Sequence, residues 1–235
     1  MSNTANIGLP LLQPAQAQKH VTVNEGFAIL DGLACLTLKS IVTTTPPGGA
    51  TDGDTYHVPP GGVNAWAGQD GKLAVFANGG WLFVVPRTGW RGWIEDAGSE
   101  AIFDGVGWRQ GAVAISAGGA ATVQEIIELD HVVASGATST VSGAVANGSV
   151  VIGVTARVTT ALTGSLTSWR LGVAGSDDRY GTGYGTALGS WARGLTSGPL
   201  AYYSETDLIL SAEGGVFDSG DVTLAIHLMR LELPA

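Results

Sequence analysis

The chain has 235 residues, including 36 glycines, and is 45% hydrophobic but only 13% charged. A disordered protein would need more charge and fewer apolar residues, so this composition predicts a folded protein, mainly β, with short strands and tight turns. The net charge of −9 arises from 11 basic and 20 acidic residues, and no Lys/Arg cluster is present, which argues against binding to nucleic acid or anionic lipid.

Residues 1–20 are predicted to form an extended arm, because Pro10 and Pro14 disfavour helix at the residues before them. No secretory signal and no membrane-spanning run is visible, so we expect synthesis in the cytosol without membrane insertion. The arm is apolar around its prolines and should dock on its own domain or on another subunit. Its candidate docking residues are Leu9, Leu11 and Leu12.

Residues 22–41 are predicted to form one helix. Thr22 and Glu25 match a T-x-x-E capping box, and apolar residues follow at three- and four-residue spacing. Because a second apolar stripe lies beside the first, the helix should be covered on more than one side, either by the following sheet or by an identical subunit. Phe27 and Leu30 therefore join the candidate attachment residues.

Residues 42–111 are predicted to form a small Trp-rich domain of β-hairpins. The segments 76–81 and 103–108 share a Phe, an Asn-Gly or Asp-Gly turn and a Trp five positions after the Phe. Such turns supply the positive φ angles of hairpins, so each Phe should face its Trp across two strands. We expect these aromatic residues to be structural, with a sugar-binding role for the block as the alternative.

Residues 112–235 are predicted to form a β-sandwich of the jelly-roll type. In the last strand the apolar alternation changes phase between Leu228 and Leu231, which predicts a β-bulge. The expected strands are 123–133, 150–158, 168–173, 208–212 and 222–233.

One segment of this sandwich, residues 169–203, combines aromatic rings, arginines and aspartates in what we expect to be a long loop. Aromatic faces stack on sugar rings, while Asp and Arg side chains fork onto paired hydroxyls. The alternative is that the rings pack the core or an interface. The candidate glycan-binding residues are Trp169, Asp177, Asp178, Arg179, Tyr180, Tyr184, Trp191, Arg193, Tyr202 and Tyr203.

Two finer expectations concern the exposure of these rings. Tyr180, Tyr184 and Trp191 are flanked by Gly, Ser and Thr, which favours exposure. Tyr202 and Tyr203 are adjacent, so in an extended segment one should face inward and the other outward.

Neither a catalytic site nor a cofactor is predicted. No spacing fixes two acidic residues in one cleft, and the four histidines are dispersed. A calcium ion at Asp177 and Asp178 has only weak support, because a single acidic pair lacks a calcium-loop pattern. The single cysteine, Cys35, excludes an internal disulfide and should be buried among apolar neighbours.

The opening sequence GLPLLQPAQAQKH at 8–20, followed by VTVNE at 21–25, resembles an uncharacterised domain family of alphaproteobacterial prophages and gene transfer agents. The chain departs from that family at Gly26 and Cys35, where charged residues are frequent. Similarity extends over nearly the whole chain, at Gly53-Asp54-x-Tyr56, Ala65-Trp66-Ala-Gly68, Gly89-Trp90-Arg91, Phe103-Asp104-Gly105, residues 188–194, Pro199, Tyr202-Tyr203 and the final strand.

The resemblance implies a structural protein on the surface of a phage-like particle, a head spike or a tail fibre, released by lysis. One branch resembles gene transfer agent head spikes, which bind the capsular polysaccharide of recipient cells. The implied partners are a capsular or surface polysaccharide, a spike-base, capsid or tail protein, and further copies of the chain, as a trimer or else a pentamer. Residues 1–41 would then serve attachment, with a capsule depolymerase or a non-binding decoration protein as alternative functions.

Overall fold

The computed structural model describes residues 3–12 and 19–234, so residues 13–18 of the predicted arm lie outside the described part. The chain divides into two compact units, Met1–Ile115 and Ser116–Ala235. The first unit unites the predicted segments 1–41 and 42–111. The mainly β fold with one N-terminal helix is confirmed.

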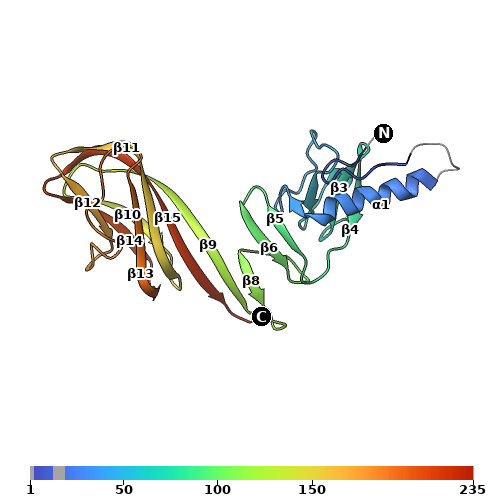
Figure 1. Cartoon of the computed structure of the whole chain (residues 1–235). Coiled ribbons are helices and arrows are strands. Elements are labelled where there is room, and N and C mark those ends of the chain that lie inside the picture. The colour runs from blue at the N-terminus through green and yellow to red at the C-terminus, as the bar shows by residue number, and fades with distance from the viewer. Residues whose placement is uncertain (1–2, 13–18, 235) are drawn as a thin grey trace. The chain divides into compact units, whose positions relative to one another are not determined.

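The described residues of the first unit form one α-helix and two small sheets (Figure 1). The sheets have the strand orders β1-β5-β6-β7 and β2-β3-β4. The elements are α1 (Lys19–Ala34), β1 (Thr37–Leu38), β2 (Thr55–His57), the 3₁₀ turn η1 (Asn64–Trp66), β3 (Leu73–Ala77), β4 (Gly80–Val84), β5 (Arg91–Ile94), β6 (Ser99–Phe103), β7 (Trp108–Gln110) and β8 (Ala112–Ile115).

The predicted bounds of the helix were wrong at both ends. Helix α1 begins at Lys19, so Thr22 lies inside it and the predicted capping box does not start it. It ends at Ala34 because Leu36 and Leu38 are buried on either side of the exposed Thr37, an alternation that suits a strand. This strand, β1, pairs in parallel with β5. Cys35 is exposed at the junction, which corrects the expectation of a buried thiol.

The two predicted Phe–Trp hairpins are confirmed. Phe76 of β3 pairs with Trp81 of β4, and their ring centroids are 4.9 Å apart. Phe103 of β6 pairs with Trp108 of β7 at 5.4 Å. Trp66 is fully buried, with its ring edge-on to Trp81 at 5.1 Å. Trp66, Phe103 and Trp108 are buried in the small cores of the first unit, and Trp81 packs against one of these cores, as expected for structural residues.

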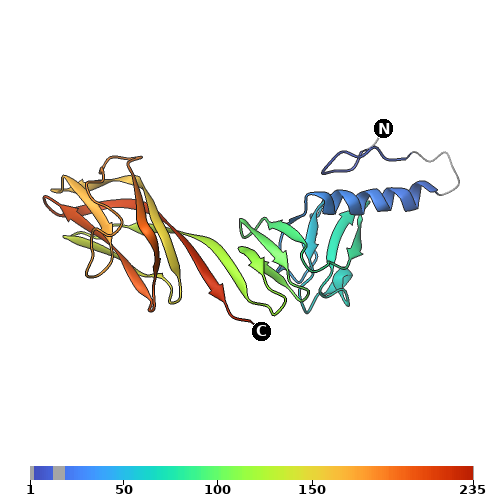
Figure 2. The same ribbon diagram turned by 60° about the horizontal axis from the view of Figure 1, so that its bottom comes forward.

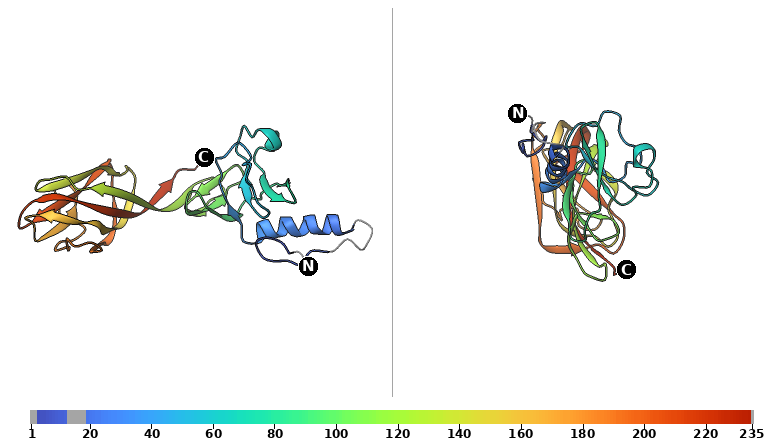
Figure 3. Two further views of the ribbon diagram at one scale, coloured as in Figure 1. Left: turned by 90° about the horizontal axis from the view of Figure 1, so that it is seen from above. Right: turned by 90° about the vertical axis from the view of Figure 1, so that its right-hand side faces the viewer.

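Asp31 of α1 fixes the described part of the arm to the helix, and the ribbon of the arm runs beside α1 in Figure 3. Its side chain is almost fully buried, and the carboxylate accepts a hydrogen bond from the Thr4 hydroxyl at 2.6 Å. The backbone N–H groups of Asn6 and Ile7 donate to the same carboxylate at 2.8 and 2.7 Å. The arm was expected to dock either on its own domain or on another subunit. Residues 3–12 dock on their own unit.

Replacing Asp31 by alanine should release this part of the arm. Burial by itself raises the pKa of Asp31, but the hydrogen bonds from Thr4 and the backbone of residues 5–7 outweigh it and hold the pKa below its ordinary value. The contact is therefore complete above the ordinary aspartate pKa of about 4 and is lost as the pH falls through the lower folded-state pKa. Because several donors lose their acceptor, we expect the free energy of unfolding to fall by about 1–3 kcal/mol.

Hydrogen exchange checks this prediction through the amide protection of Asn6 and Ile7. The variant Glu25→Ala removes an exposed carboxylate from the same helix and is the control. Full protection of both amides in Asp31→Ala would contradict the assigned role of Asp31.

His57 should make the first unit less stable in mild acid. Its side chain is buried in β2, and burial lowers the pKa of the imidazole. The unfolded chain binds a proton near the ordinary histidine pKa of about 6.5, whereas the folded unit resists that proton. The free energy of unfolding should therefore decrease from pH 7 to pH 5. Urea unfolding should show a smaller decrease in His57→Gln than in the wild type; an equal decrease would disprove the assignment.

The second unit is a sandwich of two sheets, seen as two layers in Figure 2. The smaller sheet has the strand order β10-β14-β12, and the larger one contains β13-β11-β15-β9 in that order. The strands are β9 (Ala121–Val132), β10 (Thr138–Val145), β11 (Val150–Gly164), β12 (Ser168–Gly172), β13 (Trp191–Ala201), β14 (Thr206–Glu213) and β15 (Phe217–Glu232).

The connections between these strands follow the predicted jelly-roll pattern. Consecutive strands alternate between the two sheets from β9 to β15, and the first and last strands of the unit pair along their whole common length. Beside β12, residues 181–184 take the place of a further strand, because Tyr184 forms a bridge with Trp169. Inward-facing apolar side chains of both sheets form one core.

Two details of the predicted sandwich were wrong. Strands β10 and β13 were not predicted, and β13 occupies the end of the segment expected to be a loop. The predicted bulge in the last strand is absent, because β15 stays in register with β9 from Asp221 to Glu232. Leu231 and Leu233 are instead exposed. The outer face of β15 simply becomes apolar near its end.

Candidate functional site

The outer face of the larger sheet carries a row of polar and aromatic side chains. Inward positions of β11 and β15, such as Val154, Val158 and Leu224, enter the core. Since side chains alternate along a strand, the residues between them point outward. The first outward row, read across β13, β11, β15 and β9, consists of Trp191, Arg157, Thr223 and Asp130.

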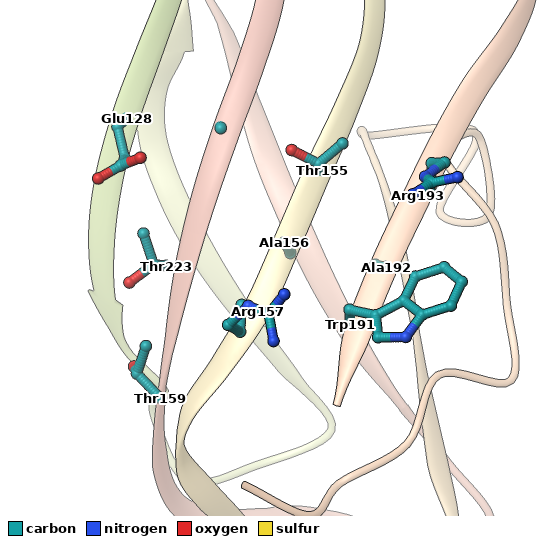
Figure 4. A pocket seen from close by; sticks show the side chains of 10 residues that line it. Glu128, Thr155, Ala156, Arg157, Thr159, Trp191, Ala192, Arg193 and Thr223 are labelled. Atoms are coloured by element: carbon teal, nitrogen blue, oxygen red, sulfur yellow. The ribbon is translucent and has the colours of Figure 1, made fainter. Parts of the chain in front are cut away.

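A second outward row lies beside the first. Across the same four strands it consists of Arg193, Thr155, Ala225 and Glu128. The two rows surround a shallow depression of about 380 Å³, whose lining includes all of these residues except Asp130 (Figure 4). Four strands that are distant in sequence thus contribute to one surface.

Trp191 is the aromatic residue of this depression. Its side chain is 59% exposed, although the Arg193 guanidinium lies over the ring, 5.4 Å from its centroid. Arg157 stands directly opposite Trp191 on β11, and its Nη1 donates to the carbonyl of Gly189 at 3.3 Å. An exposed indole next to two cations provides both a stacking surface and hydrogen-bond donors.

The opposite side of the depression is acidic and rich in hydroxyls. Thr223 donates its hydroxyl to Asp130 Oδ1 at 2.5 Å, and Glu128 is exposed on the same strand as Asp130. Thr155 lies between the cationic and acidic sides, and its hydroxyl is 3.1 Å from Nε2 of His227. The surface therefore changes from basic at β13 and β11 to acidic at β9.

Three of the predicted glycan-binding residues are buried instead. Trp169 is fully buried and donates from Nε1 to the Gly185 carbonyl at 3.0 Å. Tyr180 is only 1% exposed, which corrects its expected exposure, and its hydroxyl is 2.7 Å from that of Tyr202, also buried. Burial and this hydroxyl contact raise the pKa of Tyr180. These rings belong to the sandwich core, the alternative considered for the segment.

Four further predicted residues lie apart from the depression. Tyr184 is half-buried against Trp169, and burial raises its pKa. Tyr203 is 88% exposed beside the buried Tyr202, so the expectation of one inward and one outward ring is confirmed. Arg179 and Asp178 are exposed between β12 and β13. Of the ten candidates, the structure brings only Trp191 and Arg193 together in the depression.

Asp177 has an arginine as its neighbour. Its carboxylate lies 2.7 Å from Nη2 of Arg170 on β12. Within residues 3–12 and 19–234, no group of three or more His, Cys, Asp or Glu side chains is placed to hold a metal ion. The same part of the chain contains no helix that is long and apolar enough to cross a membrane.

The predicted attachment residues all belong to the arm and α1. Leu12 and Leu30 are exposed, while Leu9, Leu11 and Phe27 are half-buried. Asn24 holds Leu12 in place, because its side-chain amide pairs with both backbone groups of Leu12 at 3.0 Å. The exposed leucines leave apolar surface on this side of the first unit.

Sequence reasoning missed Glu128, Thr155, Arg157 and Thr223. A signal for Arg157 and Thr155 exists in the alternation of residues 154–158, where polar residues separate three apolar ones. That alternation predicts an outward face. It does not predict which strands lie beside it, because the two neighbours of β11, β13 and β15, are distant in sequence.

The family described as "Protein of unknown function (DUF2793)" matches residues 23–109, which lie within the first unit. No curated protein matches the chain. A solved chain titled "Cyanophage Pam1 capsid asymmetric unit" is 20% identical, with a TM-score of 0.29; the similarity covers 47% of this chain and 85% of that one. Residues 23–109 are thus similar to the DUF2793 family, and the similarity to the phage capsid chain is weak.

Proposed function

We propose that this chain is a structural protein of a phage-like particle, whose second unit binds a polysaccharide on the bacterial surface. The observation that carries the proposal is the exposed Trp191 flanked by Arg157 and Arg193 in a shallow depression on the outer face of the larger sheet. A shallow, open surface suits a segment of an extended polymer, and the surrounding hydroxyl and carboxylate groups suit sugar hydroxyls. The GLPLLQPAQAQKH signature supports the particle context.

The first unit is the proposed attachment region. Its arm is fixed by Asp31 and Asn24, and Leu12 and Leu30 remain exposed for a base, capsid or tail protein of the particle. Several copies of the chain would give the particle avidity for a repetitive polymer even where each site is weak.

Binding by the full chain to surface polysaccharide extracted from the encoding bacterium tests this proposal. In biolayer interferometry, a surface sparsely coated with the chain should bind the polysaccharide weakly and reversibly. From a densely coated surface, the polysaccharide should dissociate more slowly. Polysaccharide incubated with the chain should release no reducing ends, since we propose a binding protein. Absence of binding at millimolar concentrations of polysaccharide repeat units would overturn the proposal, and release of reducing ends would favour a depolymerase.

A further inference from the structure

We infer that the depression on the larger sheet is specific for an acidic sugar next to a neutral one, with the sugar carboxylate held between Arg157 and Arg193. This inference rests on the proposed function and names the class of glycan that the site takes. Its basis is the distribution of charge across the four strands that form the depression.

The two arginines are placed to share one anion. Arg157 stands opposite Trp191, and Arg193 follows two positions after Trp191 on the same face, so the arginines are diagonal neighbours across β11 and β13. Diagonal neighbours have Cα atoms roughly 7–8 Å apart, a gap that two long side chains can close around a carboxylate. Among the described residues, neither guanidinium lies in an ion pair, in contrast to Arg109, Arg170 and Arg230.

Trp191 fixes where the acidic sugar would lie. The Arg193 guanidinium rests over the indole, and Arg157 faces the ring from the neighbouring strand. A sugar ring against the indole would therefore have its carboxylate within reach of both cations. Guanidinium groups bind carboxylates through paired hydrogen bonds, which favours an acidic sugar over a neutral one.

The acidic strand β9 excludes a second anion. Glu128 and Asp130 lie two strands away from β11, a separation of roughly 10 Å at the usual strand spacing of about 4.8 Å. Carboxylates at that distance repel an adjacent acidic sugar but accept hydrogen bonds from sugar hydroxyls. The site therefore favours a polymer in which acidic and neutral sugars are neighbours over a polymer made only of acidic sugars.

Nuclear magnetic resonance with simple sugars tests the charge preference. The full chain is titrated with glucuronate and galacturonate, and separately with glucose and galactose, while the indole N–H signal of Trp191 is followed. We expect the uronates to shift this signal at millimolar concentrations and the neutral sugars to bind at least about tenfold more weakly. Arg157→Gln and Arg193→Gln should each lose the preference, and Arg87→Gln, which removes an exposed charge from the first unit, should keep it.

The outcomes separate this inference from the proposed function. Equal shifts with uronates and neutral sugars would overturn the acidic class, while binding to the bacterial polysaccharide would still support a glycan-binding protein. A uronate preference that persists in both arginine variants would also overturn it. The role of Glu128 and Asp130 is tested by comparing the binding of two polymers: hyaluronan, in which acidic and neutral sugars alternate, and polygalacturonate, in which every sugar is acidic. Tighter binding of polygalacturonate would contradict that role.

Discussion

The variant Trp169→Ala is expected to reduce the free energy of unfolding of the second unit by about 3–5 kcal/mol, the range for deleting a large buried ring. The ring is fully buried between the two sheets and packs on Tyr184, with the centroids 5.1 Å apart. Its removal leaves a cavity and deprives the Gly185 carbonyl of the donor at 3.0 Å. The melting temperature of the unit should fall by at least about 10 °C.

Differential scanning calorimetry checks this prediction, with Trp191→Ala as the matched control in the same unit. Because Trp191 is exposed on the outer face, its removal should change the free energy of unfolding by no more than about 0.5 kcal/mol. If Trp169→Ala lowers the free energy of unfolding by less than about 1 kcal/mol, the Trp169 ring is not part of the core.

The variant Trp191→Ala is expected to weaken binding to the surface polysaccharide by roughly 30-fold, equivalent to about 2 kcal/mol for loss of an aromatic hot spot. The change removes the stacking surface and also the ring on which the Arg193 guanidinium rests. Both effects act on the same ligand, since both side chains line the depression.

Tyr203→Ala is the control for this binding prediction. Tyr203 is even more exposed than Trp191, but it lies between β13 and β14 and outside the lining of the depression. The affinity of Tyr203→Ala for the polysaccharide should equal that of the wild type. If Tyr203→Ala loses binding and Trp191→Ala keeps it, the site lies on the loops of the sandwich and not on the sheet face.

Much of the fold was predictable because single strands and hairpins leave local patterns. The alternation in β15 and the Asn-Gly turn between Phe76 and Trp81 are set by neighbouring residues, and both elements are present. The helix end was less predictable, because Leu36 and Leu38 suit a helix stripe as well as a strand. Pairing of β1 with β5, more than fifty residues further along the chain, decides between them.

The candidate site was less predictable, for two physical reasons. The small residues that flank Tyr180 in the sequence suggested exposure, but the ring is buried, and Gly194 of β13 packs so closely against Tyr180 that a Cβ there would collide with its backbone. The site also depends on register, since Arg157 reaches Trp191 and Thr223 only through strand pairs across 34 and 66 positions of sequence. Composition indicated the correct residue types, while pairing decided which of them meet.

We propose above all that the outer face of β13-β11-β15-β9 binds the polysaccharide. The most direct measurement is the footprint of bound bacterial surface polysaccharide on the full chain, by nuclear magnetic resonance of backbone amides and of side-chain N–H groups. We predict that the signals of Trp191, Arg193, Arg157 and Thr155 shift together, while those of residues 174–188 and Tyr203 remain unchanged. Shifts confined to those loop residues, or to the tryptophans of the first unit, would contradict the claim.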